Sequence, residues 1–158
     1  MSDMADVKSY LAEVRPNLAI LKRRRLSLEE LLVQVSGMTR RRIAIEVCPD
    51  LLETHTSGAW VAGPEEDLVL TIPTRSWSHH CLIVYHEIGH LLMQALGIEN
   101  PNEAKVLEGV STRFGGVIRA CRGENDSPFE VAAEHIADEL LRNSLPQGSL
   151  TYFAREFG

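Results

Sequence analysis

Residues 81–93 read CLIVYHEIGHLLM, an apolar stretch that carries two histidines and a glutamate at its centre. A helix made of these residues is apolar on nearly every side, which is typical of a helix buried in the middle of a domain. We expect this helix to run from about Trp77 to Leu96 and to be stopped by Gly97. Polar side chains buried there need partners, because an unpaired carboxylate or imidazole in such a place costs on the order of several kcal/mol or is neutralised.

The three polar residues have the HExxH spacing, His86-Glu87-Ile88-Gly89-His90. Two histidines four residues apart lie on one face of a helix, so both imidazoles can bind one ion while Glu87 lies to its flank. This arrangement suits a zinc hydrolase, and coordination to a cation removes the cost of burying the polar groups. The alternative is a pair of core histidines held by hydrogen bonds, with Glu87 as their partner.

The composition fits one soluble globular domain covering residues 1–158. Within it we expect an N-terminal helical segment (1–38) and a catalytic core (40–145) that contains the HExxH segment. Hydrophobic residues make up 44% and charged residues 24%, and no apolar run approaches the roughly 18 residues of a membrane span. The first residues resemble no secretory signal, so we expect a cytoplasmic protein. Cys48, Cys81 and Cys121 form no CxxC pair and are expected to be small buried hydrophobes. Cys81 is turned away from the metal face and is not counted as a ligand.

The net charge of −6 argues against bulk affinity for nucleic acid. Two basic runs, 22–25 (KRRR) and 40–42 (RRR), flank a predicted helix. They could form a patch for phosphate or for an acidic partner, or they could be solvated helix ends and turns. No aromatic residues alternate with the basic ones and no nucleic-acid-binding motif accompanies them. Nucleic-acid binding is therefore a weaker hypothesis than a function at the HExxH segment.

The pattern of apolar residues predicts an α+β fold, a small three-stranded sheet packed against helices with the HExxH helix at its centre. Ser27 and Glu30 form a capping-box signature at the start of the second helix, and Gly37 is a fitting stop. The expected helices span 5–14, 27–36, 77–96, 103–122 (interrupted at Gly115-Gly116) and 128–143, and the expected strands span 43–47, 59–62 and 67–72.

A catalytic zinc usually takes three protein ligands, so a third must come from elsewhere. On the last helix, Glu130 and Glu134 lie four residues apart beside the buried stripe and are expected to face inward, whereas His135 and Asp138 belong to the solvated face. Ser127 and Glu130 are also spaced as a capping box, with Pro128 at the first helical position. If Glu130 folds back on Ser127, Glu134 is the natural ligand, and both possibilities remain open at this point.

The segments His86 to Leu92, Asp67 to Ser78 and Glu130 to Ala137 (EVAAEHIA) resemble the ImmA/IrrE family of metallopeptidases, small bacterial and phage proteins with a gluzincin-type site. The resemblance covers roughly residues 40–145. It implies that His86, His90 and Glu130 are ligands of Zn²⁺, that Glu87 is the catalytic base, and that Glu134 orients a histidine from the second shell. Glu134 stands where many family members carry Asn.

The resemblance also implies that the protein is a zinc metalloendopeptidase that cleaves or inactivates a partner protein, typically a helix-turn-helix repressor. Members of the family carry out such regulatory proteolysis on phages or mobile elements or in toxin–antitoxin pairs. Zinc would polarise the scissile carbonyl, and Glu87 would take and return the proton. We expect the strand 67–72 to be an edge of the sheet, along which an extended substrate could add. No oxyanion donor is assigned among Tyr152, Arg113 and His135. The alternative is a non-catalytic, zinc-containing regulatory module that sequesters its partner.

Overall fold

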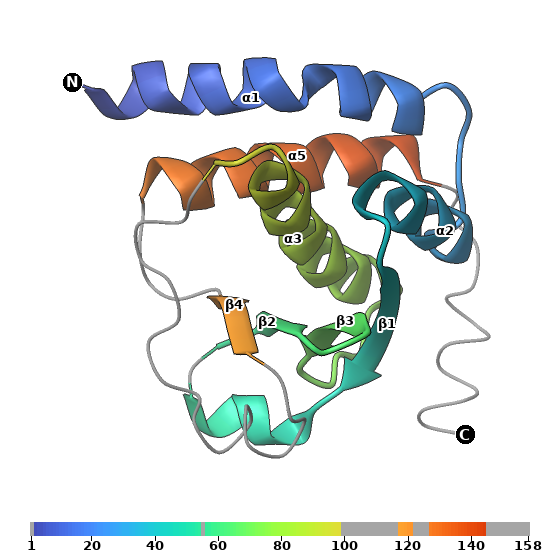
Figure 1. The fold of residues 1–158 in the computed structure, drawn as a ribbon. Coiled ribbons are helices and arrows are strands. Elements are labelled where there is room, and N and C mark those ends of the chain that lie inside the picture. The colour runs from blue at the N-terminus through green and yellow to red at the C-terminus, as the bar shows by residue number, and fades with distance from the viewer. Residues whose placement is uncertain (1, 55, 99–116, 122–126, 145–158) are drawn as a thin grey trace.

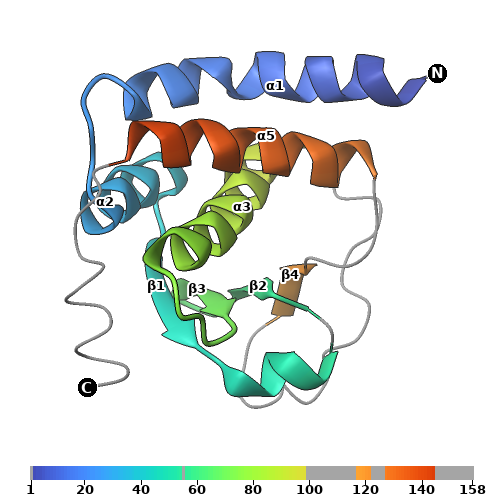
Figure 2. The ribbon, with the colours of Figure 1, turned by 180° about the vertical axis from the view of Figure 1, so that it is seen from behind.

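The computed structural model describes residues 2–54, 56–98, 117–121 and 127–144, and Figure 1 shows their arrangement in layers. Helix α1 (Ser2–Leu21) lies along α5 (Pro128–Asn143), and α3 (Trp77–Ala95) crosses beneath α5. Helix α2 (Leu28–Thr39) packs beside α3, and a sheet forms the layer below. Figure 2 shows the same order of layers from behind. The α+β class and the central buried helix are confirmed.

The sheet has the strand order β1-β3-β2-β4, formed by β1 (Arg42–Val47), β2 (Gly58–Ala62), β3 (Glu66–Thr71) and β4 (Val117–Cys121). Strand β1 pairs with β3 in parallel, and the remaining pairs are antiparallel. The three strands expected from the alternating sequence are present within a residue of their predicted ends. A short 3-10 helix, η1 (Pro49–Thr54), connects β1 towards β2.

Two expectations about the sheet are wrong. Strand β3 is not an edge, because β1 pairs with one of its sides and β2 with the other. The stretch 117–121, expected to be the end of a helix, forms strand β4, because pairing with β2 at an otherwise open edge outweighs local helical preference. The rest of that expected helix, 103–116 and Arg122, lies outside the described residues.

The two N-terminal helices are longer than the sequence suggested. Helix α1 continues through Pro16, which is exposed, because Val14, Leu18 and Leu21 are buried on the opposite side. Helix α2 continues through Gly37 and ends at Arg40, which takes the left-handed conformation (φ 58°). Gly37 therefore does not stop the helix. Gly97, in contrast, ends α3 as predicted, with φ +85°.

The main core lies between α3, the other helices and one face of the sheet, and a smaller apolar cluster lies between the opposite face and η1. Cys48 and Cys81 are buried free thiols, as expected, whereas the side chain of Cys121 is not described. None of the described helices is both long and apolar enough to cross a membrane.

Candidate metal centre

The HExxH residues of α3 are completely buried in the core. His86 is 1% exposed, and Glu87 and His90 are 0% exposed. Their side chains place three potential ligand atoms within 4.8 Å of one another. The two imidazoles lie edge to face with ring centroids 4.6 Å apart, the relation expected for residues i and i+4 on one helix face.

Helix α5 brings a second acidic group to these histidines. The carboxylate of Glu130 lies 2.8 Å from His86 Nε2 through one oxygen and 3.2 Å from His90 Nε2 through the other. Glu130 is itself buried, at 7% exposure. Two imidazole nitrogens and a carboxylate from distant parts of the sequence therefore meet at one point, and all three are atoms that zinc accepts as ligands.

The N-terminal cap of α5 does not use the Glu130 carboxylate, which is therefore able to contact the histidines. The Ser127 side chain accepts a hydrogen bond from the Glu130 backbone N–H at 3.3 Å, so Ser127 caps the helix. The Glu130 carboxylate does not complete a capping box with Ser127 and contacts the histidines instead. The choice that the sequence left open between capping and facing the histidines is therefore resolved in favour of the histidines.

Glu134 lies one turn further along α5 and contacts the other nitrogen of His86. Its carboxylate is 3.0 Å from His86 Nδ1, and its side chain is 41% exposed. The expectation that Glu134 faces inward holds in part, since the residue lies at the border of the buried stripe. A carboxylate beside the outer nitrogen of a histidine fixes the orientation and tautomer of the ring, as carboxylates commonly do behind metal-binding histidines.

Glu87 lies beside the pair of histidines rather than between them. One of its oxygens is 3.2 Å from His90 Nδ1, on the opposite side of that ring from Nε2. Neither oxygen forms a hydrogen bond of acceptable geometry with a described residue, and the same is true of His90 Nε2. Buried polar atoms in this condition cost free energy unless something else satisfies them. The site therefore has the capacity to bind an ion through its nitrogens and a proton-bearing molecule at Glu87.

The charges in the site shift the titration of its members. Burial opposes charging of His90, but the neighbouring carboxylates of Glu87 and Glu130 outweigh burial and raise its pKa to about 9. For His86, burial is likewise outweighed by Glu130 and Glu134, and the pKa rises. Burial would raise the pKa of Glu130, yet the two histidines lower it to about 2. Without a metal, the site is thus a charge-paired cluster that favours a carboxylate on Glu130.

Small residues allow the close crossing of α3 and α5 that assembles the site. A Cβ placed on Gly89 would lie 3.2 Å from the backbone Cα of Ala133 and 3.3 Å from its carbonyl oxygen. Gly58 on β2 has a similar role beneath Glu87, because a Cβ there would lie 2.6 Å from Ile83 Cγ2 and 3.3 Å from Glu87 Oε2. Sequence reasoning missed both contacts, although the glycine within HEIGH was visible as an unusual residue in a buried helix.

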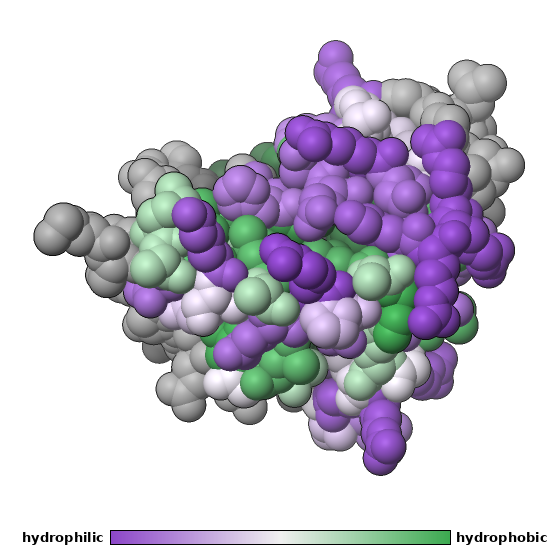
Figure 3. All heavy atoms as spheres, turned by 90° about the horizontal axis from the view of Figure 1, so that it is seen from above, coloured by the Kyte–Doolittle hydropathy of each residue, from purple (hydrophilic) through white to green (hydrophobic). Residues whose placement is uncertain are grey.

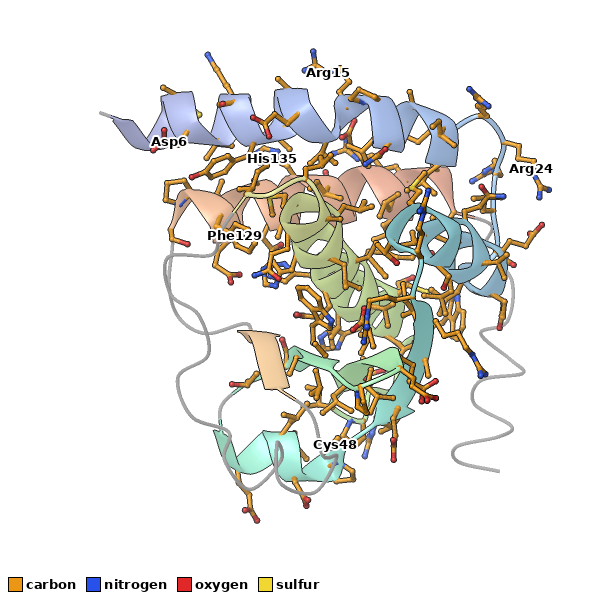
Figure 4. All side chains as sticks on the ribbon, in the orientation of Figure 1. Asp6, Arg15, Arg24, Cys48, Phe129 and His135 are labelled. Carbon is orange, nitrogen blue, oxygen red and sulfur yellow. The ribbon has the colours of Figure 1, made fainter. Side chains whose placement is uncertain are left out.

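Phe129 is another contributor that the sequence did not single out. Its ring lies against that of His90, with centroids 5.0 Å apart, and it is 1% exposed. Figure 4 shows Phe129 on the sheet-facing side of α5 and His135 on the side that faces α1. His135 is exposed and Asp138 pairs with Arg142, as expected for the solvated face. Tyr152 and Arg113 lie outside the described residues.

The basic runs are largely engaged in contacts with other residues of the chain. Lys22 pairs with Glu139, Arg24 with Glu30, and Arg25 donates to the Ser144 carbonyl. In the second run, Arg40 is the C-cap of α2 and Arg41 pairs with the buried Asp67. These contacts support the interpretation of the runs as helix ends. Figure 3 shows that polar residues dominate the face over α1, with hydrophobic residues visible among them.

Comparisons of the chain with protein-family models, with curated proteins and with solved structures give no match.

Proposed function

We propose that this protein is a zinc-dependent endopeptidase acting on a partner protein. The observation that carries the proposal is the meeting of His86 Nε2, His90 Nε2 and the Glu130 carboxylate at distances of 2.8 and 3.2 Å, with Glu87 buried beside them. Two histidines and a glutamate are one of the ligand sets of catalytic zinc, which leaves a further position for water or substrate.

The donor set fits zinc better than it fits a structural core pair. Core histidines would satisfy their nitrogens with hydrogen bonds, whereas His90 Nε2 and both oxygens of Glu87 have no such partner among the described residues. Glu130 would be the third ligand because it reaches the Nε2 atoms of both histidines. Glu87 reaches His90 only at Nδ1, which points away from an ion held by Nε2.

Zinc, when bound, polarises a carbonyl group and lowers the pKa of water at its open position. Glu87 would accept the proton of the attacking water and deliver it to the leaving amine, because one of its oxygens lies within 4.8 Å of a ring nitrogen of each histidine and neither oxygen is held by a hydrogen bond to a described residue. Glu134 would hold His86 in the tautomer that presents Nε2 to the ion. Phe129 would keep the ring of His90 in place by packing.

An extended segment of the substrate would bind along β4. This strand is an edge of the described sheet and pairs with β2, whose Ala59 lies opposite Cys121 and directly follows Gly58, the residue beneath Glu87. A peptide added to an edge strand gains main-chain hydrogen bonds whatever its sequence. The partner would be a helix-turn-helix repressor, a proposal that rests on the resemblance to ImmA/IrrE metallopeptidases.

Metal content and proteolysis test this proposal together. After extensive dialysis the protein should retain about one zinc per chain, as expected for one three-ligand site. His86→Ala should remove the metal, and His79→Ala, which changes an exposed histidine of the same helix, should not. Glu87→Gln should keep the zinc and lose cleavage of a helix-turn-helix repressor encoded beside the gene.

Two outcomes would redirect the proposal. A protein without zinc, with unchanged stability in chelator, would contradict the metal site. Bound zinc and firm partner binding without cleavage, with partner binding unaltered in Glu87→Gln, would show the non-catalytic regulatory module instead.

A further inference from the structure

Helix α1 carries a heptad pattern, of which the described fold uses only one side. Its a positions are Met4, Leu11 and Leu18, its d positions are Val7, Val14 and Leu21, and its e positions are Lys8, Arg15 and Lys22. Lys22 continues the helix by its backbone, because its N–H donates to the Leu18 carbonyl at 2.9 Å. In coiled coils the a and d residues form the apolar seam, and charges at e select the partner helix. All the cations of residues 2–22 therefore lie in one row beside the seam.

Helix α5 covers the d row of α1 and leaves the e row open. The d residues are at most 3% exposed and belong to the main core, where α1 packs on α5. Along the a row, Leu18 is buried, Leu11 is half-buried and Met4 is 61% exposed. The e residues are all exposed. Among the described residues, the open side of the seam therefore has no partner helix.

A groove with a volume of ≈ 620 Å³ lies on this open side, between α1 and α5. It is lined by Leu11, Arg15, Leu18, Ala19, Lys22, His135, Asp138, Glu139 and Arg142. Figure 4 shows Arg15 on the outer side of α1 and His135 on the side of α5 that faces α1, so these two residues mark opposite rims. From Leu11 to Lys22 the groove follows α1 for roughly 16 Å, which is about three turns of a third helix.

The charges on the α5 rim are already paired. Arg142 Nη2 lies 2.7 Å from Asp138 Oδ2, and Glu139 Oε1 lies 3.0 Å from Lys22 Nζ, which reaches it from the α1 side. These four charges cancel. A ligand in the groove therefore meets little net charge on the side of α5 unless His135 is protonated.

The α1 rim, in contrast, carries uncompensated positive charge. Neither Lys8 nor Arg15 forms an ion pair or a side-chain hydrogen bond with any described residue. Their spacing of seven residues places the two charges about 10 Å apart along one line of the helix. Acidic residues seven apart on a facing helix would match both of them, which is the complementarity by which e positions select a partner.

The opposite rim distinguishes a protein helix from other acidic partners. Nucleic acid or an anionic membrane would bring negative charge against Asp138 and Glu139 as well as against the cations. A helix can instead carry acidic residues on the flank that faces α1 and none on the flank that faces α5. Its apolar row would lie between the two flanks, over Leu11 and Ala19.

We propose that the groove between α1 and α5 binds an amphipathic helix of a partner protein, with an acidic flank that pairs with Lys8 and Arg15. An amphipathic helix laid into a groove is a general mode of peptide recognition. The groove shares no residue with the candidate metal centre, so this proposal does not depend on the proposed peptidase activity.

Binding of a synthetic helix to the full chain tests the proposal. The probe is a fluorescent three-heptad peptide with Leu at its a and d positions and Glu on its flanks, followed by fluorescence anisotropy. We expect saturable binding with a dissociation constant on the order of 10 µM, weakened by added salt. The same peptide with Lys in place of Glu should bind about tenfold more weakly or worse, and chelation of zinc should change neither result.

A charge reversal separates recognition from folding. Lys8→Glu combined with Arg15→Glu should weaken binding of the Glu peptide about tenfold or more and should strengthen binding of the Lys peptide. This gain requires a folded groove. Arg42→Glu combined with Arg75→Glu makes the same change of net charge at exposed residues outside the groove and should leave both affinities unchanged.

Three results would overturn the proposal. The first is the absence of saturable binding of the Glu peptide to the parental protein. The second is an equal affinity for that peptide in the parental protein and in the variant reversed at Lys8 and Arg15. The third is tighter binding of duplex DNA, or of vesicles containing phosphatidylserine, than of the Glu peptide, which would assign the cation row to a polyanionic surface instead.

Discussion

The starts of α2 and α5 carry the same local sequence signal and use it differently. Both have Ser at the N-cap and Glu three residues later, Ser27 with Glu30 and Ser127 with Glu130. At α2 the Glu30 carboxylate accepts from the Ser27 backbone N–H at 3.0 Å and completes the capping box. At α5 the Glu130 carboxylate leaves its cap and contacts His86 and His90.

The difference lies in what the rest of the fold brings to each glutamate. Glu30 lies at the surface, where its carboxylate pairs with Arg24 and accepts from the nearby Ser27 backbone N–H. Glu130 lies 40 and 44 residues from the two histidines in sequence, and the close crossing at Gly89 and Ala133 puts it against them. A charge-assisted contact inside the core outweighs one exposed hydrogen bond. A capping signature therefore fixes where a helix begins and leaves the role of its glutamate to tertiary structure.

The largest effect should come from changing the two glutamates in parallel. Glu130→Gln should weaken zinc binding by two orders of magnitude or more, roughly 3 kcal/mol, because Gln lacks the negative charge with which the Glu130 carboxylate would bind the cation. Glu30→Gln should leave zinc affinity unchanged, since Gln also serves in a capping box. Competition with a fluorescent chelator measures both. Equal zinc affinity in the two variants would remove Glu130 from the ligand set.

The second effect concerns the residue behind the ligand. Glu134→Gln should weaken zinc binding about 10- to 100-fold, or roughly 1.4 to 2.8 kcal/mol, because His86 would lose the carboxylate that orients it. The same chelator competition measures this loss. Glu139→Gln serves as the control, because Glu139 is a glutamate of the same helix that pairs with Lys22 rather than with a histidine. A larger loss in Glu134→Gln than in Glu130→Gln would reverse the roles of the two residues.

The third effect tests the close crossing of α3 and α5, which α2 lacks at its own glycine. Gly89→Ala should destabilise the protein by about 1–3 kcal/mol, because the added methyl meets the Ala133 backbone. Gly37→Ala in α2 should stabilise it by about 0.5–1 kcal/mol, since no atom lies within 4 Å of the new methyl. Urea unfolding of the metal-free proteins measures both. A Gly89→Ala protein as stable as its parent would show that the crossing is looser than described.

The smallest effect concerns the caps themselves. Ser27→Ala and Ser127→Ala should each cost about 1 kcal/mol of unfolding free energy, because each serine caps one helix. Thermal unfolding of the metal-free variants would show this. Zinc affinity should change little in either variant, and a loss of zinc confined to Ser127→Ala would indicate that the cap also positions Glu130.

The sequence predicted those parts of the molecule whose signals are local. The HExxH helix, the strands β1 to β3, the Ser27 cap and the Gly97 stop follow from apolar periodicity and from turn and cap residues. Strand β4 and the interior place of β3 did not follow, because strand pairing depends on residues far apart in sequence.

The candidate site was predictable to a similar extent. The spacing of His86, Glu87 and His90 pointed to the site, and helical periodicity limited the third group to Glu130 or Glu134. Only the structure shows which carboxylate meets both Nε2 atoms. The contacts of Gly89 with Ala133 and of Phe129 with His90 depend on how two helices cross, which no single helix reveals.

A crystal structure of the zinc-loaded protein, with anomalous diffraction recorded at the zinc edge, tests the central claim most directly. We predict a single strong peak about 2.0–2.2 Å from His86 Nε2, His90 Nε2 and a Glu130 oxygen, with Glu130 turned away from the Ser127 amide. A peak elsewhere, or a Glu130 carboxylate folded back on Ser127 as Glu30 is on Ser27, would contradict the account.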